Sequence, residues 1–215
     1  MKDNLKLKET LRLFQGANGD ESCLAKQFSN LAHYFFYSGY LLINSKTKIY
    51  LRDIEFYYHE EFGSIKDPIM YHRNTKKNKN VKYFPLGLLN AHESGIDITF
   101  EDDKKQYRAS ILIRGFNIIK EEDAIWPIEY NRRSTHIYEA LFMQASLLEG
   151  IHIEWIHKPT TPPCQNSKIE TTVRVNVCKF DENENKKKYE GSGLCTENKK
   201  YIQDERQWRF ILRIQ

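Results

Sequence analysis

Residues 48–59, Lys-Ile-Tyr-Leu-Arg-Asp-Ile-Glu-Phe-Tyr-Tyr-His, are the stretch that decides the fold. This aromatic-rich run follows a Ser-Lys-Thr turn and predicts a β-strand. By the two-residue period of a strand, Asp53, Glu55 and Tyr57 share one face with Ile49 and Leu51, so each face mixes apolar and polar residues. Two interpretations stay open: an edge strand with a wet face, or a catalytic carboxylate at the mouth of a pocket.

The rest of the chain predicts an α+β domain, a curved and mostly antiparallel β-sheet with a few packing helices. Helices are expected from a cap at Asp20 or Ser22 to about Tyr37, stopped by Gly39, and from Ser134 to about Leu148, ended by Gly150. Further strands are expected at Tyr40–Ile43, Gly95–Glu101, Arg108–Phe116, Ile151–His157, Ile169–Phe180 and Gln207–Ile214. Residues 60–93 form a long irregular segment of the kind that often serves function, and Asp181–Lys200 an exposed loop. Residues 1–19 are expected to form a short helix or docking arm before a single domain at 20–215.

Composition excludes several classes of protein. The 215 residues include 12 Phe, 13 Tyr and 3 Trp, which argues against a disordered chain. No apolar run is long enough to span a bilayer, and no signal peptide follows the N-terminal lysines. The four cysteines form no C-x-x-C pair, so we expect reduced thiols in a cytoplasmic protein, here a monomer. The net charge of +4 permits a nucleic-acid partner without requiring one.

One motif resembles a metal site and is rejected. His152-Ile-Glu154 followed by Pro163-Cys164 is similar to the H-x-E and P-C-x-x-C pattern of zinc deaminases. Zinc needs a third protein ligand there, and Ser167 stands where a thiolate should be. We therefore predict no metal site and no cofactor.

Arg114 ends the apolar strand Arg108–Phe116, and an Arg at that place needs a partner if it is buried. Either its side chain reaches solvent from the end of the sheet, or it lies beside Glu55 and lowers the pKa of that carboxyl.

Six segments, taken in order, carry a family resemblance. They are Asp53-Ile-Glu-Phe-Tyr, Ser94-Gly-Ile-Asp-Ile-Thr-Phe, Ala109-Ser-Ile-Leu-Ile-Arg-Gly-Phe, Ser134-Thr-His-Ile-Tyr-Glu-Ala-Leu, Thr172-Val-Arg-Val and Trp208-Arg-Phe-Ile-Leu-Arg. They resemble, respectively, the E-T-E-A-Y strand, the Y-G-M hairpin strand, the A-V-L-I-R-A-L strand, the G-P-x-x-L-x-x-A-L helix and the two closing strands of the 3-methyladenine (alkyladenine) DNA glycosylase family. The resemblance runs from about residue 24 to the end of the chain.

The resemblance implies a monofunctional N-glycosylase of base excision DNA repair, without lyase activity, that takes a flipped purine from DNA into a pocket. Glu55 matches the Glu that activates water, Arg114 the Arg that supports that water, and Tyr57 a Tyr that stacks on the base. His72 is chosen as the family's stacking His, although it follows Asp67 with one additional residue and Tyr71 holds the strict position. A carboxylate is ionised at pH 7, can accept a proton and can stabilise positive charge on the sugar.

The chain departs from the family in its predicted hairpin. Asn90, Ala91 and Ser94 replace tyrosines that stack on the base and wedge into the duplex, and Glu101 falls near the family's pocket Asn. Without a wedge, the expected substrate is an exposed base, a single strand or a free nucleoside, with His92 and Glu93 as altered contacts.

The alternative is a non-catalytic protein of the same fold that binds a nucleotide or another small ligand. The basic clusters Lys76–Lys79 and Lys186–Lys188 are either phosphate contacts or solvated loop charge.

Overall fold

The computed structural model describes residues 3–17, 19–67, 69–70, 72–75, 78–120, 130–143, 150–159, 167–175, 177–180 and 201–214. Within these ranges it contains three helices, α1 (Asp3–Arg12), α2 (Glu21–Tyr37) and α3 (His136–Met143). The strands are β1 (Gly39–Ile43), β2 (Thr47–Glu60), β3 (Leu89–His92), β4 (Gly95–Thr99), β5 (Tyr107–Lys120), β6 (Ile153–His157), β7 (Lys168–Thr172), β8 (Cys178–Phe180), β9 (Tyr201–Gln203) and β10 (Arg209–Arg213). The α+β class is confirmed.

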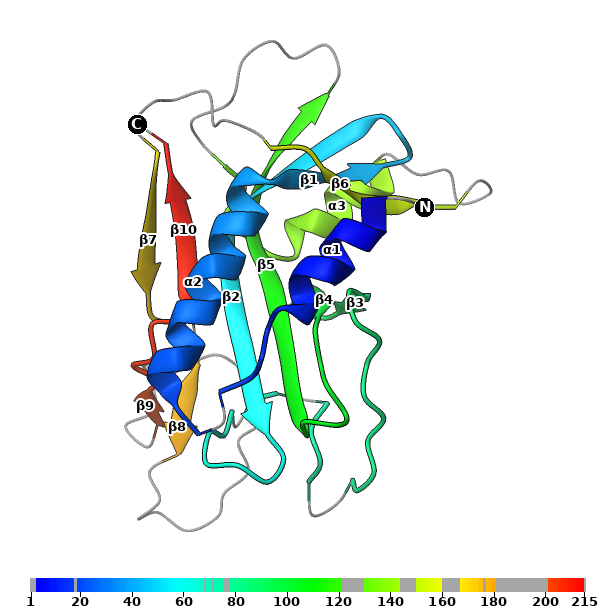
Figure 1. The fold of residues 1–215 in the computed structure, drawn as a ribbon. Coiled ribbons are helices and arrows are strands. Elements are labelled where there is room, and N and C mark those ends of the chain that lie inside the picture. The colour runs from blue at the N-terminus through cyan, green and yellow to red at the C-terminus, as the bar shows by residue number, and fades with distance from the viewer. Residues whose placement is uncertain are drawn as a thin grey trace.

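The main sheet is a curled antiparallel half-barrel built around β2 and β5, which run side by side (Figure 1). Its order is β3-β4-β5-β2-β1-β6, and β10 pairs with the middle of β2 and then with β7. Strand β2 is therefore central, with β5 on one side and β1 and β10 on the other. The edge-strand interpretation of residues 48–59 is wrong, because both sides of this strand are paired and Glu55 is fully buried.

Two compensating bulges explain why the pattern of β2 was ambiguous. The pairing passes from Leu51–Phe116 to Asp53–Gly115 and then to Ile54–Ile113, so that Arg52 and Arg114 are the unpaired extra residues. Each bulge shifts the alternation of a strand by one residue. The core side of β2 is therefore Ile49 and Leu51 before the bulge and Ile54, Phe56 and Tyr58 after it. Asp53, Glu55, Tyr57 and His59 lie on the opposite, polar face.

Helix α2 covers the apolar face of this sheet. Its N-cap Asp20 accepts a hydrogen bond from the Ser22 N–H at 2.8 Å, as the sequence predicts. The helix buries Phe28, whose ring stacks on that of Phe56 with centroids 4.3 Å apart. The side chains of Leu7 and Leu11 in α1 belong to the same core, so the first helix packs with the rest of the domain.

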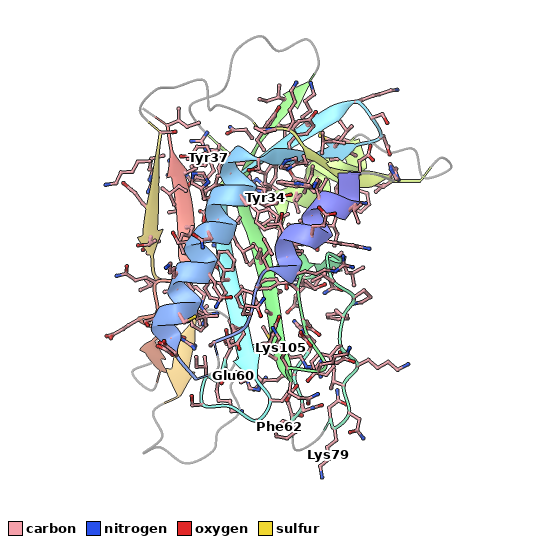
Figure 2. All side chains as sticks on the ribbon, viewed as in Figure 1. Tyr34, Tyr37, Glu60, Phe62, Lys79 and Lys105 are labelled. Atoms are coloured by element: carbon pink, nitrogen blue, oxygen red, sulfur yellow. The ribbon has the colours of Figure 1, made fainter. Side chains whose placement is uncertain are left out.

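Two of the predicted segments, 169–180 and 60–93, differ in the structure. Residues 169–180, expected as one strand, divide into β7, which pairs with β10 in the main sheet, and β8, which pairs with β9 in a separate two-stranded sheet. The predicted helix 134–148 is described only as α3, since residues 144–149 lie outside the described residues, as do 181–200. The segment 60–93, expected to be irregular throughout, is so only in part, because Glu60 still belongs to β2 and Leu89–His92 form β3. The described residues between 61 and 88 form no helix or strand. Figure 2 shows Phe62 and Lys79 at the end of the molecule away from Tyr34 and Tyr37.

Gly39 has a role different from the predicted helix stop. Ser38 is the C-cap of α2, and Gly39 opens β1 opposite His157 of β6. A Cβ at this position would lie 2.2 Å from the carbonyl oxygen of Ile156 and 2.7 Å from the Trp155 ring. The missing side chain lets the two strands approach each other.

We therefore expect Gly39→Ala to destabilise the protein by about 1–3 kcal/mol, because a backbone oxygen cannot move away without breaking the β1–β6 pairing. Urea unfolding followed by circular dichroism measures this change. A midpoint equal to that of the wild type would contradict the close packing of the two strands.

None of the described helices is long and apolar enough to cross a membrane.

Candidate active site

The polar face of the sheet carries a continuous row of partnered residues. Across β3, β4, β5, β2, β10 and β7 the row reads Asn90, Asp97, Leu112, Glu55, Arg209 and Thr172. Residues directly opposite each other on neighbouring strands share a face. Strand β5 lies between β4 and β2, and its pairing with both thus places two carboxylates, Asp97 and Glu55, on one side of the sheet.

Glu55 is fully buried at the centre of this row, and both of its carboxyl oxygens accept hydrogen bonds. Oε2 accepts from the Tyr57 hydroxyl at 2.8 Å, and Oε1 accepts from the Val175 N–H at 2.7 Å. A carboxylate offers about four acceptor positions, so room for further donors remains.

The pKa of Glu55 is raised above its ordinary value by burial. The charge of Arg114 opposes this shift most, followed by the Val175 N–H, the Tyr57 hydroxyl and the charge of Arg209. Of the two alternatives for Arg114, the structure shows the one in which it lies beside Glu55 and acts to lower the pKa of that carboxyl, although burial outweighs this effect. A buried carboxylate with a raised pKa is a stronger proton acceptor than one in solvent.

Arg114 and Arg209 flank Glu55 but differ in how they are held. Arg209 forms a two-pronged ion pair with Asp53, at 2.9 and 2.6 Å. Arg114 has its Nε 3.6 Å from Oε1 of Glu55, and this nitrogen has no hydrogen-bond partner among the described residues. A fifth of the Arg114 side chain is exposed. Glu55 and Arg114 therefore lie close together, as predicted. Arg114 is the extra residue of the bulge on β5, and its guanidinium lies between the carboxylate and solvent.

Tyr57 contacts both Glu55 and the buried Arg174 on the polar face. Burial first and then the charge of Glu55 raise the pKa of Tyr57 well above its usual value, so the phenol stays protonated and donates to the carboxylate. One side of its ring is occupied, because the Arg174 guanidinium lies 4.7 Å from the ring centroid.

Arg174 is a buried residue that the sequence singled out only as part of a family motif. Its Nη1 donates to Asp67 at 2.5 Å and to the Phe56 carbonyl at 3.2 Å, and its Nη2 donates to Asp204 at 3.0 Å. Burial opposes ionisation of Asp204, but its hydrogen bond and charge contact with Arg206, helped by Arg174, lower its pKa to about 2. This cluster holds the turn that presents the Val175 N–H to Glu55.

His72 and Glu101 come together, but in a different part of the face. His72 Nδ1 contacts the Glu101 carboxylate, whose other oxygen accepts from the Phe84 N–H at 2.7 Å. Glu101 also lies 3.4 Å from the Nη1 of Arg108. In the sheet, Arg108 of β5 stands opposite His59 of β2, which is four residues beyond Glu55 along that strand. His72 and Glu101 thus tie segment 61–88 to the sheet, and Tyr71 lies outside the described residues.

The predicted hairpin residues lie on the other flank of the row. Asn90 faces Asp97 across β3 and β4, and His92 Nε2 lies 3.1 Å from the Asp97 Oδ1. Ser94 is exposed at the tip of this hairpin, where its N–H donates to His92 Nδ1.

Sequence reasoning missed Asp97, the buried carboxylate of this flank. It accepts a hydrogen bond from the Ser110 hydroxyl at 3.1 Å. The alternation of Asp97, Thr99 and Glu101 with Ile96, Ile98 and Phe100 was the signal that could have found it.

Several predicted features fall outside the description. Cys164 of the rejected zinc motif, Lys76, Lys77 and Lys186–Lys188 are not among the described residues. In the part of the chain that is described, no group of three or more His, Cys, Asp or Glu side chains could hold a metal ion.

Comparison with known proteins gives no family for this chain. No protein-family model matches it, and neither a curated protein nor a solved structure shows a significant match.

Proposed function

We propose that this protein is an N-glycosidase-type hydrolase that resembles the 3-methyladenine DNA glycosylases in fold and reaction, and that acts on a modified purine. The observation that carries the proposal is the meeting of Glu55, Tyr57 and Arg114 on the polar face of a central strand pair. These are the three residues at which the six-motif resemblance expects the water-activating Glu, the base-stacking Tyr and the supporting Arg.

In this proposal Glu55 accepts a proton from a water molecule as that water attacks the anomeric carbon of the sugar. The raised pKa of Glu55 brings proton acceptance closer to neutral pH, and the carboxylate stabilises positive charge growing on the sugar. Arg114 can donate a hydrogen bond from its guanidinium to the same water, since its Nε makes no hydrogen bond to another described residue. Tyr57, held by Arg174 on one side, offers the other side of its ring to a base.

The hairpin residues favour an accessible base as substrate. Serine at the tip of the β3–β4 hairpin cannot fill the gap left by a flipped nucleotide, and flipping from a duplex costs a few kcal/mol. A single-stranded nucleic acid or a free nucleoside avoids this cost.

The direct test is base release from three substrates. They are a single-stranded oligonucleotide with one hypoxanthine or 7-methylguanine, the same strand in a duplex, and the free nucleoside of the same base. Liquid chromatography of the released base measures the reaction, and an unmodified strand is the control. Release from the modified strand above the control supports the proposal. Binding without release of any base would favour the non-catalytic alternative, and a steep loss of affinity with salt would then identify a nucleic-acid ligand.

Ser94→Tyr tests the assignment of the hairpin tip. An aromatic ring at this exposed position is expected to raise the ratio of duplex to single-strand release about tenfold, because it can stack in place of the flipped base. Comparing the two rates for the variant and for the wild type gives this ratio. Ser94→Ala is the control, and an unchanged ratio in the tyrosine variant would count against the assignment.

A further inference from the structure

The ring of Tyr130 is held against the polar face of the sheet. Next to it, the backbone of Asn131 exchanges two hydrogen bonds with Phe116 of β5, at 3.0 and 2.9 Å, which fixes this segment to the sheet. A Cβ at Gly115, which stands opposite Asp53 of β2, would lie 2.5 Å from the Tyr130 ring. The ring therefore lies directly on a sheet position that has no side chain.

Arginines surround this ring. The guanidinium carbons of Arg52 and Arg132 lie 5.1 and 5.3 Å from its centroid. Burial and then the charge of Asp53 raise the pKa of Tyr130 above its ordinary value, so its hydroxyl stays protonated and can donate. The charges that oppose this shift belong to Arg213, Arg132 and Arg209. The phenol thus lies within electrostatic reach of several cations.

Hydrogen-bond donors around the ring are left without acceptors. Neither the Tyr130 hydroxyl nor the Arg132 guanidinium forms a hydrogen bond or an ion pair with a residue that the structure describes. Within the described ranges, Arg213 donates only from its Nε, to Glu170 at 2.9 Å, and its side chain is 42% exposed. Guanidinium donors gathered beside a protonated phenol, and open to solvent, suit the oxygens of an anion.

The charge of this cluster indicates which anion fits. Among the described residues, the charged groups that act on Tyr130 or Glu55, together with the carboxylate paired to Arg213, are Arg52, Arg114, Arg132, Arg209, Arg213, Asp53, Glu55 and Glu170. Five guanidinium groups against three carboxylates leave two positive charges, whose repulsion a bound anion relieves. A phosphomonoester carries about −1.5 to −2 at pH 7, whereas each phosphodiester inside a strand carries about −1. A terminal phosphate therefore matches the excess better.

We propose that the cluster around Tyr130 binds the terminal phosphate of a phosphomonoester, with the Tyr130 hydroxyl, Arg132 and Arg213 as donors. The rest of the ligand rests on the proposed function. Asp53, beside this cluster, and Glu55 are two residues apart on β2, about 7 Å, which one ribose spans between its 5′-phosphate and its anomeric carbon. The substrate is then a purine 5′-nucleotide, either free or at the 5′ end of a strand.

Binding tests the phosphate site without any reaction. Adenosine 5′-monophosphate and adenosine carry an unmodified base, and isothermal titration calorimetry gives the ratio of their affinities. The wild type should bind the nucleotide at least about tenfold more tightly, because charge-assisted hydrogen bonds to phosphate are strong. Arg132→Gln should remove most of this ratio and Tyr130→Phe about threefold of it, while the affinity for adenosine stays within about twofold.

Arg12→Gln on α1 removes the same charge from another exposed position and is the matched control, which should keep the ratio. Inorganic phosphate should compete with the nucleotide for the wild type and compete less for Arg132→Gln. Equal affinities of the wild type for nucleotide and nucleoside, or a ratio that Arg132→Gln leaves unchanged, would overturn the site.

Release of hypoxanthine distinguishes the sources of the phosphate. The substrates are inosine 5′-monophosphate and single strands with hypoxanthine at a 5′-phosphorylated end or at an internal position. Fastest release from the free nucleotide or from the phosphorylated end supports a terminal phosphate and identifies its source, whereas fastest release from the internal position would overturn it. A wild type that prefers the nucleotide in binding but releases no base keeps the phosphate site and loses the proposed function. Base release without that preference is the opposite result.

Discussion

Glu55→Gln is expected to reduce base release by about 100- to 10,000-fold, because the amide cannot accept the proton of the attacking water. The substitution keeps the size of the side chain and one carbonyl oxygen for the Tyr57 hydroxyl or the Val175 N–H. The rate of the wild type should rise with pH as Glu55 loses its proton, and this rise should be absent in the variant. Single-turnover release measured from pH 4 to 8 gives both results.

The fold should survive this substitution. A carboxyl whose pKa is raised in the folded state contributes stability that is present below its unfolded pKa and lost as pH rises through the folded pKa. Ionised Glu55 therefore costs stability, and the neutral Gln removes this cost. Glu170→Gln is the matched control. Glu170 of β7 forms an ion pair with Arg213 of β10, and both side chains are partly exposed to solvent. A Glu55→Gln protein that folds and releases base at the wild-type rate would remove Glu55 from the mechanism.

Arg174→Met should cause the largest loss of stability, about 3–5 kcal/mol, because it leaves Asp67 and Asp204 as buried carboxylates without their shared cation. Methionine retains much of the apolar volume between the Tyr57 and Trp208 rings, so the loss reports the charge rather than a cavity. Denaturant unfolding at pH 7 measures it. Arg213→Met removes an exposed ion pair of the same type and should cost less than about 1 kcal/mol.

The pH dependence of this loss has a definite sign. The folded pKa of Asp204 is lowered to about 2, so its contribution to stability is present above the unfolded value and is lost as pH falls through about 2. Arg174 supplies part of this lowering, and Arg206, which the variant keeps, supplies the larger part. The difference in stability between Arg174→Met and the wild type should therefore narrow in part as pH decreases from about 4 towards 2 and Asp204 takes up a proton. Adding Asp67→Asn and Asp204→Asn to the variant should recover part of the stability at pH 7. Equal stability of Arg174→Met and the wild type at pH 7 would show that the cluster does not hold the turn.

Local signals in the sequence predicted most of the secondary structure. The stripe of Leu24, Phe28, Leu31 and Phe35 after a capping Asp20 predicts α2 because helix formation depends on neighbours three and four residues apart. The long alternating runs predict the strands because side chains along a strand point in turn to its two faces. The division of residues 169–180 was missed, because Arg174 leaves the sheet only to reach partners 107 and 30 residues away.

By itself, the sequence determined the α+β class, the positions of the main helices and strands, and the types of residue that could do chemistry at 55, 57 and 114. Only the tertiary structure decided which of them meet. Two bulges change the alternation of β2 and β5, and a strict two-residue period cannot reveal an inserted residue. They place Glu55 on a buried polar face, turn Arg114 towards it, and leave His72 and Glu101 as a separate pair. Asp97 joins the row of Glu55 because β5 pairs on one side with β4, its neighbour in the chain, and on the other with the distant strand β2. The register of such a long-range pairing is set by packing of the whole sheet.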